Sequence, residues 1–240
     1  MIGGEFAGQV AVVTGASAGV GRAVALALAA EGAAVGLVAR REEGLRAVAA
    51  EVERAGGRAL PLPADVADEA AIGAAVARAA RELGGLDILI ANAGANRGGP
   101  VDGYPLADWN LVLGTNLTGV FLAARAALPH LKARGGGQII AVASGAGKQG
   151  YPNLAAYCAA KFGVLGFMQA LAAEVKADGI RCGVIVPGSI LTEFGGRSIA
   201  EKRAGSGTYL HPEDVAASIL HQLRQPAHAW VQELHLWPFG

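Results

Sequence analysis

Short apolar runs alternate with longer segments of helical periodicity along the whole chain. The short runs are continuously apolar, which is typical of parallel strands that are covered on both faces. They predict seven strands, at Val10–Thr14, Ala34–Ala39, Ala59–Leu62, Asp87–Ala91, Gln138–Ala143, Ile180–Val186 and Val231–Leu236. The segments between them predict six helices, at Gly21–Glu31, Glu43–Ala55, Ala67–Leu83, Leu106–Lys132, Leu154–Ala177 and Pro212–Leu223.

This alternation predicts the fold class. It indicates an α/β fold: a single Rossmann-like, doubly wound domain over residues 1–240, with about seven mostly parallel strands and helices on both faces of the sheet. The stretch Glu193–Leu210 contains four glycines, lacks clear periodicity and follows the sixth strand, where doubly wound sheets bind ligands. We therefore expect residues 193–210 to form a mobile substrate-binding loop rather than a domain boundary.

Composition and charge narrow the class of partner. Of 240 residues, 52% are hydrophobic and 17% charged, and the net charge is zero, so the chain can bury a full-sized core. No run of like charges is present, which argues against a nucleic acid or an acidic membrane and favours a small-molecule partner. The apolar run Ala23–Ala30 is too short to cross a bilayer, and we expect no secretory signal, so the expected location is the cytoplasm. The two cysteines and five histidines have no metal-binding spacing, and we expect no metal site.

A glycine-rich turn follows the first predicted strand, with the sequence Thr14-Gly15-Ala16-Ser17-Ala18-Gly19-Val20-Gly21. Glycines let a backbone approach a pyrophosphate closely, because a Cβ would block that approach. The helix that starts here offers unpaired N–H groups and the positive end of its dipole. The turn therefore predicts a dinucleotide site.

A second motif predicts the chemistry. Tyr157-Cys158-Ala159-Ala160-Lys161 places a tyrosine and a lysine one turn apart on one helix face, and Ser144 ends the fifth strand thirteen residues earlier. A free tyrosine, with a pKa of about 10, is a poor base at neutral pH. We expect the nearby ammonium to lower the Tyr157 pKa toward the working range.

With these motifs the chain resembles the short-chain dehydrogenase/reductase family over almost its whole length. The TGxxxGxG turn, the Asn92-Ala93-Gly94 motif, Ser144 and Tyr-x-x-x-Lys follow in the family's order. Ala91 departs from the usual first asparagine of the family's NAG motif. The resemblance implies a cofactor site made by Gly15, Ser17, Gly19, Val20, Gly21, Arg40, Arg41, Asp65, Val66, Asn92, Gly94, Tyr157, Lys161, Pro187, Gly188, Ile190 and Thr192.

The resemblance also implies roles in catalysis. Tyr157 gives a proton to a carbonyl being reduced or takes one from an alcohol being oxidised, and Ser144 holds the same oxygen. Lys161 tunes Tyr157 and binds the nicotinamide ribose, while Asn116 kinks its helix and positions a water that relays the proton. Substrate contacts are expected from Ser144, Tyr157 and Gln149, the last of which lies in the loop after Ser144.

The end of the second strand bears on the choice of cofactor. A carboxylate there accepts hydrogen bonds from a ribose 2′-hydroxyl, whereas an arginine pairs with a 2′-phosphate. Here the acidic position holds Ala39, followed by Arg40 and Arg41, which favours NADP(H) while NAD(H) stays possible. Solvated arginines at a helix start would give the same pattern, and Ala18 supplies no second basic contact.

Two other functions stay open. Acyl-carrier-protein ketoacyl reductases of the family commonly carry a basic residue where this chain has Asp178, and a non-catalytic nucleotide-binding regulator would usually lose Tyr157 or Lys161. The resemblance further implies a homo-oligomer, a tetramer or a dimer, paired through the two long helices, Leu106–Lys132 and Leu154–Ala177, and through the region of the last strand. We expect Trp230 and Trp237 to be core or subunit-contact residues.

Overall fold

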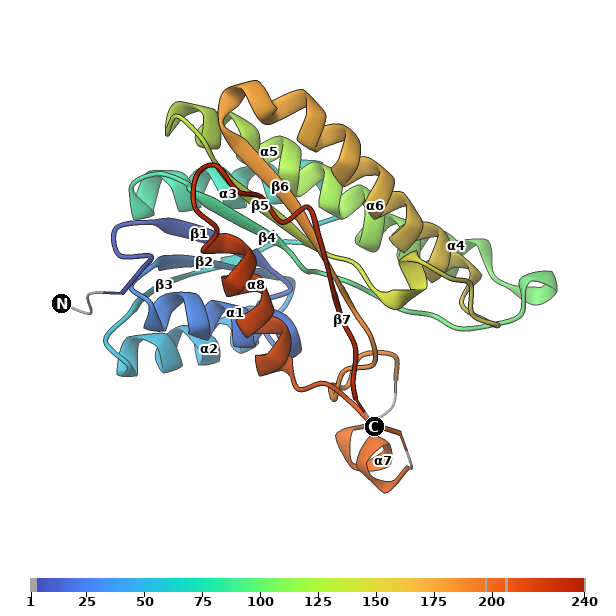
Figure 1. The fold of residues 1–240 in the computed structure, drawn as a ribbon. Coiled ribbons are helices and arrows are strands. Elements are labelled where there is room, and N and C mark those ends of the chain that lie inside the picture. Colours follow the sequence, from blue (N-terminus) through green and yellow to red (C-terminus); the bar gives the residue numbers. More distant parts are fainter. Residues whose placement is uncertain (1–3, 197, 206, 240) are drawn as a thin grey trace.

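The computed structural model describes residues 4–196, 198–205 and 207–239, which form one sheet with helices on both faces (Figure 1). The seven strands lie in the order β3-β2-β1-β4-β5-β6-β7, and every pair of neighbours is parallel. Their bounds are β1 Val10–Thr14, β2 Ala34–Ala39, β3 Arg58–Pro63, β4 Ile88–Ala91, β5 Gly137–Val142, β6 Ile180–Pro187 and β7 Glu233–Leu236. The predicted fold class is confirmed.

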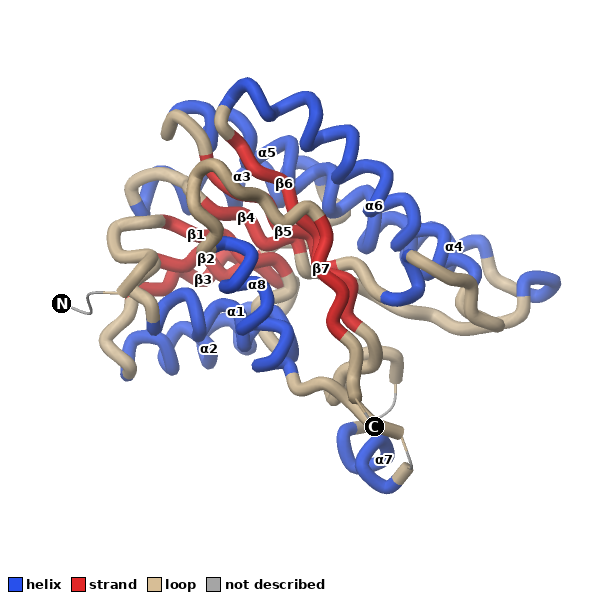
Figure 2. The backbone as a smooth tube through the Cα atoms, viewed as in Figure 1, coloured by secondary structure: helices blue, strands red, loops and turns tan. Residues whose placement is uncertain are grey.

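The helices form two layers, one on each face of the sheet (Figure 2). One apolar core lies between the sheet and the helices α1 (Gly19–Ala30), α2 (Glu42–Arg54) and α8 (Pro212–Leu223). The other lies beneath α3 (Glu69–Leu83), α5 (Gly119–Ala133) and α6 (Ala155–Val175), with α4 (Leu106–Leu113) beside α6. Central strands such as β1 and β4 are buried over their whole length, which explains their continuous apolar runs.

The strand β3 contains Pro61 and Pro63 yet still pairs with β2 over six positions. It lies at the edge of the sheet, where a residue without an N–H group leaves no neighbouring strand unpaired. Prolines are therefore tolerated in this strand.

The predicted helix Leu106–Lys132 is interrupted by a π-helical turn, Gly114–Thr118. Asn116 lies in that turn and its side-chain Nδ2 donates to the carbonyl of Val112, four residues earlier, at 2.8 Å. A side chain that takes a backbone carbonyl within a helix disturbs the regular ladder of hydrogen bonds. The interruption therefore lies at the position where the resemblance implies a kink.

The stretch Glu193–Leu210 contains a short helix, α7 (Ile199–Ala204), that the apolar pattern did not predict. Six residues are too few to show a period, but the helix begins with a capping box between Ser198 and Glu201. Positions 197 and 206 of the predicted loop lie outside the described residues. The rest of the stretch forms the loop that leads from β6 toward α8 (Figure 1).

Two helical stretches, Leu106–Ala133 and Ala155–Asp178, are long and apolar enough to cross a membrane by length and composition alone. Both stretches pack on the sheet, with 44% and 50% of the tested segments buried, so packing against the core explains why one face of each is apolar. Their outward faces still carry large apolar side chains, among them Phe121 and Phe162.

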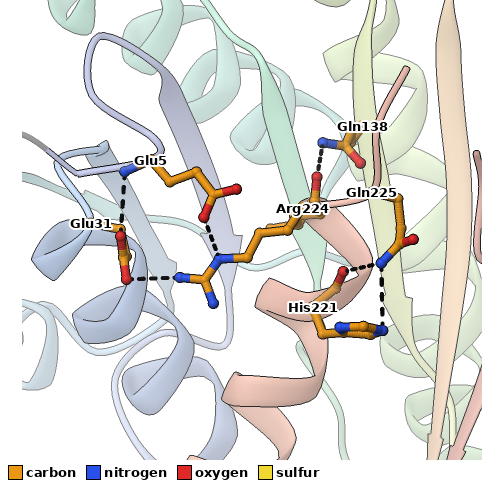
Figure 3. Close-up of polar contacts among 7 residues, drawn as sticks. Glu5, Glu31, Gln138, His221, Arg224 and Gln225 are labelled. Atoms are coloured by element: carbon orange, nitrogen blue, oxygen red, sulfur yellow. Dashed lines mark hydrogen bonds and ion pairs between the residues drawn. The ribbon is translucent and has the colours of Figure 1, made fainter. Parts of the chain in front are cut away.

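A polar network ties the chain together near the amino ends of the strands (Figure 3). Arg224, just after α8, pairs with Glu5 at 2.7 Å and with Glu31 at 2.7 Å, and the backbone N–H of Glu5 donates to Glu31 at 3.3 Å. Gln138, in β5, donates to the Leu223 carbonyl at 3.0 Å. These partly exposed ion pairs are each worth at most about 1 kcal/mol, and they join the N-terminal turn to the ends of α1 and α8.

Candidate active site

A cleft of about 1000 Å³ opens where the strands β1 to β6 end, and the loops that follow them line it. Open parallel sheets bind their ligands at this edge. All the predicted cofactor residues except Gly21 line the cleft, as do Ser144 and Tyr157, whereas Asn116 and Gln149 do not.

The glycine-rich turn leaves its backbone open to the cleft. Gly15 has a φ of +67°, and a Cβ there would lie 2.8 Å from Nδ2 of Asn92. Gly21 lies beneath the turn, where a Cβ would come within 2.2 Å of the Gly15 carbonyl oxygen. Ala18, the N-cap of α1, provides no side-chain cap, so the first N–H groups of this helix stay available to an anion.

Asn92 joins the end of β4 to the end of β1. Its Nδ2 donates to the carbonyl of Thr14 at 2.9 Å, while Oγ1 of Thr14 accepts from the N–H groups of Asn92 and Ala93 at 2.9 and 3.0 Å. These bonds join the loops that follow β1 and β4, so Asn92 stabilises the fold and also lines the cleft.

The other end of the cleft is basic. Arg40 and Arg41 follow β2, are exposed and line the cleft, and Ala39 lies beside them. Within the described residues neither guanidinium takes part in a hydrogen bond or ion pair that would occupy it. Asp65, which follows β3, also lines the cleft, and its carboxylate accepts from the N–H of Ala67 at 2.9 Å.

Tyr157 and Lys161 lie on α6, and Ser144 lies directly after β5. The Lys161 Nζ is 5.7 Å from the centroid of the Tyr157 ring and donates to the Val142 carbonyl at 2.7 Å. Oγ of Ser144 accepts from the N–H of Ala146 at 3.2 Å, and a hydrogen bond joins the side chains of Ser144 and Tyr157. The structure thus brings the three predicted catalytic side chains together at one point of the cleft.

The acid–base properties of this cluster differ from the expected ones. Burial raises the pKa of Tyr157 to about 12, and the hydrogen bond from Ser144 opposes that rise only in part. Burial also lowers the pKa of Lys161 to about 8, because a charged ammonium is costly in this setting. The expectation that Lys161 lowers the Tyr157 pKa is therefore wrong for the protein without ligand: desolvation sets the direction, the opposing contribution comes from Ser144, and the Lys161 ammonium donates to a backbone carbonyl.

Asn116 is fully buried behind the cleft rather than in its wall. Its Nδ2 donates to the carbonyls of Ala95 and Val112 at 2.7 and 2.8 Å. Its Oδ1 has no hydrogen-bond partner among the described residues, so it can accept from a water.

Gln149 is directed to a neighbour instead of the cleft. Its Nε2 donates to the hydroxyl of Tyr151 at 2.5 Å, and Tyr151 is the residue of this pair that lines the cleft. Phe194 and Lys202, which lie in the loop predicted to bind substrate but were not singled out there, also line the cleft. Trp237 lines it too and is 48% exposed, so it is not the core residue that was expected as one alternative. Trp230 behaves as expected, since it packs on the core and its Nε1 donates to the Cys182 carbonyl at 2.8 Å.

Among the described residues, no group of three or more His, Cys, Asp or Glu side chains could hold a metal ion. The chemistry that the arrangement itself supports is proton transfer at Tyr157 and binding of an oxygen atom by Ser144 and Tyr157.

Comparison with known proteins defines the class. The sequence profile of the short chain dehydrogenase family matches residues 9–203. The chain belongs to this family and is an oxidoreductase that acts on alcohol and carbonyl groups.

Three curated relatives are each 38% identical to the chain. Glycine betaine reductase ATRR of Emericella nidulans matches over 98% of this chain, which spans only 19% of that longer protein. D-threitol dehydrogenase of Mycolicibacterium smegmatis matches over 88% of this chain and 84% of its own length. The 3-oxoacyl-acyl-carrier-protein reductase of Escherichia coli matches over 84% and 81%, respectively.

A solved structure gives a similar result. A metagenomic short-chain oxidoreductase in complex with NADP superposes with a TM-score of 0.86 at 34% identity, over 98% of this chain and 99% of that one. The likeness covers both the cleft and the sheet.

Proposed function

We propose that this chain is an NADP(H)-dependent oxidoreductase that interconverts a carbonyl and an alcohol on a small or medium organic substrate. The observation that carries the proposal is one cleft with Ser144, Tyr157 and Lys161 at one end and, at the other, two arginines that have no ion-pair partner in the described part of the chain. We also propose that residues 1–240 act as a single domain, located in the cytoplasm. Two buried free cysteines, Cys158 and Cys182, fit a reducing compartment.

The cleft suits a phosphorylated dinucleotide. The uncapped start of α1 and the glycine backbone would hold the pyrophosphate, and Arg40 would pair with a 2′-phosphate. Ala39 leaves out the carboxylate that would repel this phosphate. The NADP complex of the similar metagenomic protein supports this preference, and NAD(H) remains a possible second cofactor.

A bound nicotinamide supplies or accepts the hydride. The chain's own part is the proton: Tyr157, with a pKa raised to about 12, is protonated at neutral pH and can donate to a carbonyl oxygen. Ser144 stabilises the charge that develops on that oxygen. The buried Oδ1 of Asn116 offers an acceptor for a water in a proton relay.

Reduction of a 3-oxoacyl thioester on a carrier protein is the second candidate, and the Escherichia coli relative favours it. Against it, Asp178 replaces the basic residue common in such enzymes, and its carboxylate pairs with Lys132 at 2.8 Å. An acidic carrier protein would meet a compensated pair at this position. Turnover of an acetoacetyl thioester distinguishes the two candidates.

We further propose that the chain forms a homo-oligomer, a dimer or a tetramer, through the outer faces of α5 and α6. Phe121 on α5 is 39% exposed and Phe162 on α6 is 47% exposed, and contact with a second copy would cover both. Light scattering at micromolar concentration tests this, and a monomer mass would contradict it.

The proposed function itself is tested by steady-state reduction of a broad carbonyl panel with NADPH and with NADH. We expect NADPH-dependent reduction of at least one class of ketone or aldehyde. Binding of NADPH without turnover across the panel would instead favour a nucleotide-binding regulator.

A further inference from the structure

The substrate end of the cleft has an apolar, aromatic rim. Four of the large hydrophobic side chains that remain exposed line the cleft: Tyr151, Phe194, Ile199 and Trp237, with exposed fractions of 36%, 42%, 37% and 48%. Single exposed hydrophobic residues are ordinary on a protein surface, but a group of them around a cavity marks a binding site.

Trp237 reaches this rim from the end of β7. Its indole packs so closely on two glycines that a Cβ at Gly145 would lie 2.6 Å from Cη2, and one at Gly188 would lie 2.8 Å from Cε3. Gly145 follows Ser144 directly, so the ring borders the catalytic serine. The Gly188 N–H, which donates to the Leu236 carbonyl at 2.8 Å, fixes the strand that carries the ring.

Phe194 borders the catalytic tyrosine. The centroids of the Phe194 and Tyr157 rings are 5.8 Å apart, with an angle of 49° between their planes. A Cβ at Gly94 would lie 3.4 Å from the Phe194 ring, so this ring lies over the loop after β4. A substrate whose oxygen is held by Ser144 and Tyr157 would therefore place its substituents against aromatic rings.

The cations near this rim are already engaged. Lys202 is 9% exposed, and its Nζ donates to the carbonyls of Ile190, Thr192 and Phe194 at 3.3, 2.5 and 3.2 Å. The ammonium thus pins the loop that carries Phe194, instead of facing the cavity as a free charge.

Two further cations near the rim are also paired. Lys148 pairs with Glu233 at 2.7 Å, and Arg97 lies 3.9 Å from Asp108. Lys161, which lines the cleft beside Tyr157, donates to the Val142 carbonyl at 2.7 Å. An anionic group on the substrate would therefore lose its hydration at this rim and, among the described residues, meet only cations that already have a partner.

We infer that the substrate is an uncharged alcohol or ketone with an apolar ring, which packs against Trp237 and Phe194. This inference rests on the proposed function and names its substrate class. The aromatic rim supplies the contact area for the ring, and the engaged lysines disfavour carboxylates and phosphates.

The test is a matched set of ketones reduced with NADPH at pH 7.5: 4-methylcyclohexanone, 4-oxocyclohexanecarboxylate and the methyl ester of that acid. The kcat/KM of each neutral ketone should exceed that of the carboxylate by about tenfold or more, because only the carboxylate must lose the hydration of a charge. The methyl ester is similar in size to the acid, so it separates the effect of charge from that of size. Equal or better reduction of the carboxylate would overturn the inference.

A variant pair tests the aromatic contact. Trp237→Ala should raise the KM for 4-methylcyclohexanone by about tenfold and change that for butan-2-one far less, because the small ketone does not reach the ring. Phe239→Ala is the matched control, since Phe239 is fully exposed two residues away and does not line the cleft. An equal effect of Trp237→Ala on both ketones would overturn the assignment of Trp237.

The two levels of the account fail differently. If the ring ketones are inert while other carbonyl compounds are reduced with NADPH, the substrate class is wrong and the proposed function stands. If no carbonyl compound in the broad panel is reduced with either cofactor, both are wrong.

Discussion

Relative to a variant that lacks the Lys161 ammonium, the protein without ligand should be less stable at neutral pH than at high pH, because the ammonium is buried. Burial lowers the Lys161 pKa from 10.5 to about 8. Between these two values the unfolded chain binds a proton that the folded protein does not, so stability increases with pH in this window. Above pH 10.5 both states are neutral at this group, and below about pH 8 the folded protein carries the full cost of a buried charge. At about 1.4 kcal/mol per pKa unit, the difference corresponds to about 3 kcal/mol.

The assay is urea unfolding of the wild type and of Lys161→Met, both free of cofactor, from pH 7.5 to 10.5. The stability of the wild type relative to the variant should rise by about 3 kcal/mol over this range. The opposite contribution of Tyr157, whose raised pKa removes stability above pH 10, is common to both proteins and cancels. Lys176→Met is the control, because Lys176 is exposed just after α6, and its difference from wild type should stay flat. A flat difference for Lys161→Met as well would refute the argument that burial sets the state of this lysine.

Three further predictions follow from the cleft. The wild type should prefer NADPH over NADH by at least about tenfold in kcat/KM, and the double variant Ala39→Asp with Arg40→Ile should reverse that preference in the same kinetic assay. Equal efficiency of the wild type with both cofactors would mean that Arg40 only faces solvent. Gly21→Ala should lower the melting temperature and weaken NADPH binding, because its Cβ would lie 2.2 Å from the Gly15 carbonyl oxygen. Gly73→Ala on α3, where a Cβ meets nothing within 4 Å, is the control and should be neutral or stabilising; similar effects of both changes would contradict the packing argument. Because burial raises the Tyr157 pKa to about 12, the titration of Tyr157 should change the kcat of ketone reduction little from pH 6 to 9, whereas the kcat of alcohol oxidation should increase with pH. Profiles of kcat against pH in both directions check this, and an oxidation rate that is flat with pH would contradict it.

The sheet could be predicted from the sequence because its signal is local. A strand such as Val10–Thr14, buried on both faces, must be apolar at every position, and this pattern is readable without knowledge of its neighbours. The i, i+4 spacing of Tyr157 and Lys161 is equally local, as is the glycine-rich turn. The predicted helix Leu106–Lys132 was less accurate, because the π-helical turn at Asn116 leaves the apolar period almost unchanged.

The parts of the site that sequence reasoning missed depend on long-range packing. Trp237 reaches Gly145 only because β7 pairs with β6 at the end of the chain, and nothing in the residues around position 237 indicates that contact. Lys202 lies on a helix too short to show a period, although the capping residues Ser198 and Glu201 could have revealed its start. The Tyr157 pKa could not be inferred from its spacing to Lys161, because burial, which dominates it, is a property of the whole fold.

The central claim is that Tyr157 is the proton donor of an NADP(H)-dependent reductase, and Tyr157→Phe tests it most directly. The change removes one hydroxyl and little volume from a half-buried position in the wall of the cleft, so folding and NADPH affinity should stay nearly as in the wild type. Steady-state turnover should fall by several orders of magnitude, because no other described side chain shares the position of the proton donor. The measurement pairs NADPH fluorescence titration with ketone reduction by the same preparation. Unchanged affinity with near-complete loss of turnover is the predicted result, and retention of about a tenth or more of wild-type turnover would contradict the account.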